Sequence, residues 1–233
     1  MLLQLKPNRQ RAKNAITFIW IVFALNMLII LFSIIQLIYG ESFDIRKIID
    51  KTWLLSFDLI YLSVYVASVV TFIQWFRRAY YNLNARIGNT LSRSDGWVAG
   101  SWFIPFVNLY LPFKLMREMY EETDKYLVSR GNETYKAERL GTGDVYTWWT
   151  LVILYTVKFS ITSSGTKKSF LTIVTNEYIA LAINTILFIL LTILTIIVIQ
   201  NYSKLELLLV EEEVKDNNMK ENYPTEPTTS LEK

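Results

Sequence analysis

Long apolar stretches constrain this sequence more than any other feature. Residues 15–39 form a run of 25 residues without a charge, and at about 1.5 Å per residue a helix of that length crosses a hydrocarbon core of about 30 Å. Residues 53–76, 145–165 and 178–199 are similar, although the first of these contains Asp58 and the second contains Lys158. The pattern predicts an all-α membrane protein with four transmembrane helices at these positions.

Lysine and arginine residues predict the orientation of these spans. The segment before the first span carries four of them and the connection at residues 77–144 carries ten, whereas the two other connections carry three and two. Because Lys and Arg accumulate on the cytoplasmic side of spans, we expect a multi-pass plasma-membrane protein with both termini in the cytoplasm.

The charge distribution also suggests three regions. Residues 1–14 are expected to be a basic cytoplasmic N-terminus, and residues 15–205 the membrane domain. Residues 206–233 are acidic and polar, a composition that buries little apolar surface. We therefore expect them to form a disordered cytoplasmic tail.

Composition excludes several classes of chemistry. The chain has no cysteine and no histidine, so disulfides, thiol nucleophiles, histidine-based triads and the usual zinc sites are absent. Only one aspartate lies within the predicted spans, which leaves no intramembrane aspartyl dyad. The net charge of +3 gives no support to nucleic-acid binding. We expect a protein that is not an enzyme and that needs no cofactor or metal.

Residues 100–114, GSWFIPFVNLYLPFK, are apolar but poorly suited to a transmembrane helix. Pro105 and Pro112 each remove a helical hydrogen bond, which lipid cannot replace. We therefore expect an interfacial or re-entrant segment on the cytoplasmic side at residues 97–130. Pro112 suits the first turn of an amphipathic helix that stops at Gly131, with one face formed by Phe113, Met116, Tyr120 and Leu127.

The aromatic rings of this segment favour the level of the lipid headgroups. Trp97 and Trp102 belong to this set, because rings with an apolar body and a polar edge prefer that level. The carbonyl groups that the prolines leave unpaired need donors, and we expect Asn108 and Arg78 to fasten the segment beneath the second span. Other candidate donors are Arg77 and Asn82.

Two interpretations of the amphipathic helix are open. In one, the helix only closes the cytoplasmic end of the helical bundle. In the other, it presents Arg117 and Glu118 to a cytoplasmic protein partner or to lipid headgroups.

The central region resembles a known family. The stretch FIQWFRRAYYNLNARIG at residues 72–88 and the stretch GWVAGSWFIPFVNLYLPFKLMREMY at residues 96–120 are similar to the bacterial membrane family catalogued as domain of unknown function 4328. The resemblance implies a protein of the bacterial inner membrane and supplies no activity. It rests on Trp75, Phe76, Arg78, Ala79, Tyr80, Asn82, Leu83, Gly96, Trp97, Trp102, Phe103, Pro105, Asn108, Leu109, Pro112, Met116 and Glu118.

Polar residues inside the predicted spans have several interpretations. Asp58, Tyr61 and Tyr65 recur at helical spacing in the second span, and Asn184 lies in the fourth. Such residues either join helices by hydrogen bonds or line an ion or proton pathway. Asp58 and Lys158 lie at similar predicted depths, so they either face one another or Lys158 extends outward alone.

These observations favour a non-enzymatic integral membrane protein that binds a protein partner or lipid through its cytoplasmic interfacial segment. The alternative is a small ion- or proton-coupled transporter or channel that uses Asp58 and Lys158. Expected partners are the lipid bilayer, a cytoplasmic protein or a second copy of the chain.

Overall fold

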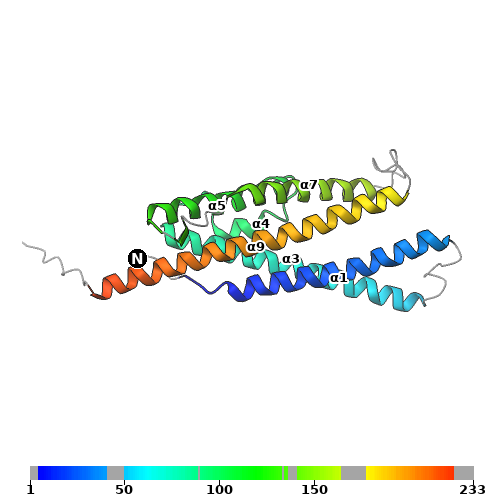
Figure 1. Cartoon of the computed structure of the whole chain (residues 1–233), viewed down its shortest axis with the longest axis horizontal. Coiled ribbons are helices and arrows are strands. Elements are labelled where there is room, and N and C mark those ends of the chain that lie inside the picture. Colours follow the sequence, from blue (N-terminus) through cyan, green and yellow to red (C-terminus); the bar gives the residue numbers. More distant parts are fainter. Residues whose placement is uncertain are drawn as a thin grey trace, which may run out of the picture.

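The computed structural model describes residues 5–40, 50–88, 90–132, 134–135, 141–163 and 177–222, with side chains at 157–163, 177–180, 220 and 222 left out. The regular elements described here are helices (Figure 1). They are α1 (Arg9–Tyr39), α3 (Lys51–Ile87), α4 (Asp95–Gly100), the short 3₁₀ helix η2 (Val107–Leu109), α5 (Leu111–Ser129), α7 (Gly143–Ser163) and α9 (Glu177–Asn222).

The long helices form two antiparallel pairs. In the first pair, Asn26 of α1 hydrogen-bonds Tyr61 of α3, and Arg11 donates to the carbonyl of Gln74. In the second pair, Trp148 of α7 donates to Thr195 of α9 at 3.0 Å. Figure 1 shows α9 running the length of the molecule, with α5 and α7 together on one side and α1 on the other.

Three helices in the described part of the chain are long and apolar enough to cross a membrane, not the four that the sequence predicted. These are α1, α3 and the part of α9 from Leu181 to Met219. The helix α7, at the position of the third predicted span, has 21 residues and exposes Tyr146, Thr147 and Thr150 on its first turns. The side chains of α7 are described only as far as residue 156, and these 14 residues are too few for a span, so the rest of the third predicted span lies outside the described side chains.

The helices also extend beyond the predicted spans. The helix α3 continues through Arg77 and Arg78 to Ile87 and ends at Gly88, whose φ of 79° is the left-handed conformation that suits glycine. The helix α9 continues from the predicted span to Asn222. The prediction of a disordered tail is therefore wrong for residues 206–222, and residues 223–233 lie outside the described part.

The extension of α9 is helical because one of its faces is buried. Tyr202, Leu205, Leu209 and Glu212 recur at intervals of three or four residues and are all buried. Packing of this face compensates for the polar and acidic residues on the other side of the helix.

The core lies at the end of the molecule where these extensions meet. It combines Trp75, Phe76, Tyr80 and Leu83 of α3 with residues of α5, α7 and α9. Large apolar side chains near the other end, such as Ile38, Trp53 and Leu59, are exposed instead. This division fits a bundle that has a water-excluding core at one end and apolar surfaces suited to lipid at the other.

The helix α5 begins and ends as predicted. Pro112 lies in its first turn, and the helix stops before Gly131, whose φ is 68°. Met116, Tyr120 and Leu127 of the predicted apolar face are buried, and Phe113 is partly buried against the core. The apolar face of α5 therefore packs within the bundle, which favours the interpretation that this helix closes it.

Candidate functional site

The segment between α4 and α5 exposes an unusual group of aromatic rings. Phe103 is 72% exposed, Phe106 is 85% exposed and Tyr110 is 58% exposed. Pro105 between them is exposed as well. We call residues 97–110 the interfacial segment.

Trp102 attaches this segment to the bundle. Its ring centroid lies 5.7 Å from that of Phe72 in α3 and 6.2 Å from that of Trp149 in α7, both in edge-on contacts. Phe113 at the start of α5 stacks on the other side of the same cluster, 6.1 Å from Trp149. Edge-on and offset contacts of this kind stabilise ring pairs by about 0.5 to 1.5 kcal/mol each beyond area burial.

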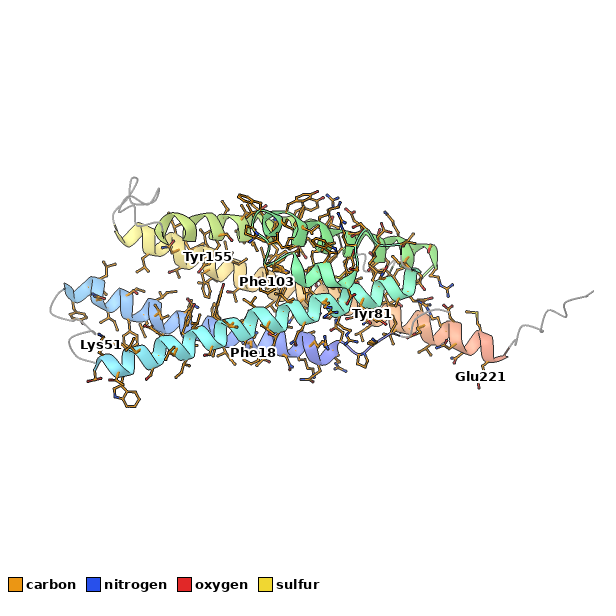
Figure 2. All side chains as sticks on the ribbon, turned by 180° about the vertical axis from the view of Figure 1, so that it is seen from behind. Phe18, Lys51, Tyr81, Phe103, Tyr155 and Glu221 are labelled. Atoms are coloured by element: carbon orange, nitrogen blue, oxygen red, sulfur yellow. The ribbon has the colours of Figure 1, made fainter. Side chains whose placement is uncertain are left out.

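The contact with Phe72 indicates the depth of the segment. Phe72 precedes Arg77, the first charge after the apolar part of α3, by five residues or about 7 Å along the helix axis. Trp102 therefore lies on the apolar side of that charge. Figure 2 agrees, since Phe103 lies along the long axis between Tyr155 in α7 and Tyr81 beyond the apolar part of α3.

The backbone at Phe106 adopts an uncommon conformation. Phe106 has a φ of 64° and a ψ of −37° at the centre of a γ-turn, a strained conformation that costs a residue with a Cβ about 1 to 3 kcal/mol. The flanking amides are satisfied locally, since Val107 donates to the carbonyl of Pro105 at 2.8 Å and Asn108 donates to that of Ile104 at 3.0 Å. The segment is thus a defined turn that presents an exposed ring.

Two carboxylates hold the chain just before the interfacial segment. Glu118 of α5 accepts hydrogen bonds from the Tyr80 hydroxyl at 2.9 Å, the Ser92 amide at 2.7 Å and the Ser92 hydroxyl at 2.8 Å. Asp95, in the first turn of α4, pairs with Arg77 of α3 at 2.9 Å. These contacts join α3, the connection to α4, and α5.

The predicted fastening of the segment by Asn108 and Arg78 does not occur among the described residues, and the two carboxylates hold the preceding connection instead. No side-chain hydrogen bond of Asn108 to another described residue occurs, and Arg78 lies 5.9 Å from the centre of the Tyr81 ring. The observed contacts follow from where these residues lie around α3. Tyr80 and Arg77 lie on the faces of this helix that meet Glu118 and Asp95.

Other predicted site residues have ordinary packing roles. Arg117 pairs with Glu121 at 3.3 Å and donates to the Tyr146 hydroxyl at 3.4 Å, which joins α5 to α7. Trp97 is partly exposed, with Arg93 lying 5.6 Å from the centre of its ring.

The intramembrane residues are only partly brought together. Asp58 is exposed on α3, while Tyr61 from the same predicted face accepts a hydrogen bond from Asn26 of α1. Lys158 lies in α7, but its side chain is outside the described residues, so the pairing with Asp58 stays a prediction. The Oδ1 atom of Asn184 is buried without a hydrogen-bond partner among the described atoms.

A buried carboxylate that the sequence did not single out joins three parts of the chain. Glu206 of α9 is only 7% exposed, and it accepts from the amide of Asn8 at 3.0 Å and from that of Asn82 at 2.6 Å. Asn82 also bonds the backbone of Lys6 through both its amide nitrogen and its carbonyl oxygen. The predicted residue Asn82 thus ties the N-terminal segment to α3 and α9.

A second polar cluster lies further along α9. Asp216 pairs with Arg86 of α3 and with Arg130 at the end of α5, and the Arg86 side chain is only 4% exposed. Glu212 accepts from Asn132 at 2.9 Å and pairs with Arg130 at 3.4 Å. The regular spacing of Leu205, Leu209 and Glu212 was the available signal that this part of the chain is a packed helix.

The fold and this site define a class: a helical protein with apolar helices suited to a membrane, a packed bundle at one end, and an exposed aromatic segment beside that bundle. In the described part of the chain, no group of three acidic or other metal-ligating side chains occurs that could hold a metal ion. Residues 50–204, from α3 into α9, match the family model of a domain of unknown function, DUF4328, and the chain belongs to this family. No curated protein and no solved structure matches it.

Proposed function

We propose that this protein is a non-enzymatic integral protein of the bacterial inner membrane that binds lipid of the cytoplasmic leaflet through its interfacial segment. The observation that carries the proposal is the exposure of Phe103, Phe106 and Tyr110 on a segment whose Trp102 packs at the level of Phe72. Rings exposed at that level meet headgroups and the first acyl carbons, where aromatic side chains are favoured.

A cytoplasmic location of both termini is part of the proposal. Its support is the excess of Lys and Arg before α1 and between α3 and α7. Contacts between the N-terminal segment and the extension of α9 add to it, since Asn8 bonds Glu206 and the Leu5 amide bonds Glu213 at 3.2 Å. The residues just before α1 lie on the side of that helix toward the last turns of α9 (Figure 1).

Lipid is a better candidate than a cytoplasmic protein for the exposed rings. A docking site for a soluble protein would lie beyond Arg77 and Arg78, in water, whereas Trp102 packs on the apolar side of these charges. In addition, Glu118 and Arg117, the residues expected to face a partner, are used in contacts within the bundle.

Site-directed fluorescence tests the proposal. The chain has no cysteine, so Phe103→Cys provides a single attachment point for an environment-sensitive fluorophore. In proteoliposomes, doxyl labels placed shallow in the acyl chains should quench this fluorophore more strongly than labels near the bilayer centre. The matched control is Glu122→Cys, on the exposed face of α5, where no acyl-chain label should quench.

Equal quenching at the two positions, or quenching of neither, would contradict the proposal. Quenching at position 103 that is strongest near the bilayer centre would also contradict it, because the segment would then be inserted deeply.

A further inference from the structure

A groove separate from the interfacial segment lies between the N-terminal part of the chain and α9. Its volume is about 650 Å³. The walls come from residues 5–9, one face of α1 and one face of α9. Its lining residues are Leu5, Lys6, Pro7, Asn8, Arg9, Ala12, Lys13, Ile16, Asn82, Gln200, Ser203, Lys204, Glu206, Leu207, Val210 and Glu213.

The groove lies where the apolar stretches end. Lys13 is one helical turn before Ile16 in α1, and Lys204 follows the last apolar residue of the predicted span, Ile199, by five positions. The cations of both helices therefore lie at the depth at which the phosphates of the cytoplasmic leaflet are expected.

Cations dominate the charge around the groove. Arg9, Lys13 and Lys204 are exposed, and none of them forms an ion pair within 4 Å with another described residue. Lys6 lies over the Tyr81 ring at 4.4 Å.

The two carboxylates in the lining do not neutralise these cations directly. Glu206 is buried and accepts from Asn8 and Asn82, while Glu213 accepts from the backbone of Leu5. The groove thus presents a positive potential above apolar walls.

We propose that this groove binds one anionic phospholipid of the cytoplasmic leaflet. The phosphate would lie between Lys13 and Lys204, and the polar end of the headgroup would extend toward Lys6 and Arg9. The acyl chains would leave the groove past Ile16, where α1 enters its apolar stretch. Charge complementarity selects an anionic lipid over a neutral one, and the position at the end of two apolar stretches selects a lipid over a soluble anion.

Native mass spectrometry of the purified full chain in detergent tests the proposal, with phosphatidylglycerol as the probe and phosphatidylcholine of the same acyl chains as the neutral comparison. We expect phosphatidylglycerol to bind more tightly. The double variant Lys13→Gln with Lys204→Gln should raise its Kd about 30-fold, which equals about 2 kcal/mol at 1.4 kcal/mol per factor of ten.

Two comparisons separate the groove from general surface charge. Lys114→Gln with Lys125→Gln removes the same charge from α5, outside the groove, and should change the Kd by no more than about threefold. Lys13→Arg with Lys204→Arg should keep the wild-type Kd, and it keeps the proposal testable if the Gln variant fails to fold.

The proposal fails if both Gln variants weaken binding equally, if phosphatidylcholine binds as tightly as phosphatidylglycerol, or if the Arg variant also loses binding. It also fails if millimolar glycerol 3-phosphate displaces the lipid, since the site would then recognise a soluble phosphate. None of these outcomes involves position 103, so the groove and the interfacial segment are tested independently.

Discussion

The carboxylate of Glu118 should contribute more to stability than any exposed acid on the same helix. It accepts three hydrogen bonds, and one of the donors, the Tyr80 hydroxyl, belongs to a fully buried residue. The Ser92 donors are exposed, so water replaces Glu118 there at little cost. The effect of Glu118→Ala is therefore mainly the loss of the charged acceptor of the Tyr80 hydroxyl, about 2 to 3 kcal/mol.

Thermal unfolding in detergent measures this effect. For a chain of this size, 1 kcal/mol corresponds to about 2 to 4 °C, so the Tm of Glu118→Ala should fall by about 4 to 12 °C. The matched control is Glu122→Ala, which breaks only the exposed pair with Lys125 at 2.7 Å and should cost less than about 1 kcal/mol.

A double-mutant cycle identifies the cause. Tyr80→Phe removes the hydroxyl, and in that background Glu118→Ala should cost at least about 1 kcal/mol less than in the wild type. Equal Tm values for Glu118→Ala and Glu122→Ala, or additive effects in the cycle, would refute the assignment.

Three further predictions concern the rest of the bundle. Asp216→Leu should lower the free energy of unfolding, measured by SDS titration, by about 3 kcal/mol, because it removes a carboxylate that compensates the buried charge of Arg86. Adding Arg86→Met should recover part of this loss. A further loss of the same size in the double variant would contradict the prediction. Burial raises the pKa of the Tyr120 phenol, so the folded state keeps this proton while the unfolded chain releases it above about pH 10. Stability should therefore fall as the pH rises past 10, as followed by tyrosinate absorbance and circular dichroism, and less steeply in Tyr120→Phe; an identical slope in that variant would exclude this phenol as the cause. Finally, an impermeant maleimide added to intact cells should label Thr52→Cys and not Ser94→Cys, and labelling at position 94 would overturn the proposed orientation.

Much of the candidate site could be predicted from the sequence because its signals are local. Two prolines seven residues apart indicate that residues 100–114 are not a transmembrane helix, and the structure contains turns and a 3₁₀ helix there. Pro112 and Gly131 marked the region of α5 for reasons of backbone conformation alone. The family pattern pointed to Tyr80, Asn82 and Glu118, although their roles differ from those expected.

The predictions failed where charged and polar residues were interpreted without the residues that they contact in the fold. Residues 206–222 are acidic, so composition favoured disorder, but Glu206, Glu212 and Asp216 each find donors on other elements. Asn108 was selected because it lies between the two prolines, and Arg78 because it lies at the cytoplasmic end of the second predicted span. Which residue of α3 reaches the segment depends instead on the rotation of that helix against α5, and nothing in a single sequence determines it.

The sequence by itself determined that this chain is helical, that it has apolar stretches long enough for a membrane, and that an aromatic, proline-bearing segment follows the second of them. These properties follow from hydrophobic length and backbone conformation, which are set by neighbouring residues. The tertiary structure alone decided that Glu118 joins Tyr80 to the connection before the interfacial segment, that Glu206 joins Asn8 to Asn82, and that cations of α1 and α9 meet around one groove. Those contacts join residues up to about 200 positions apart, and a buried carboxylate is stable only where packing brings donors to it from such distant parts of the chain.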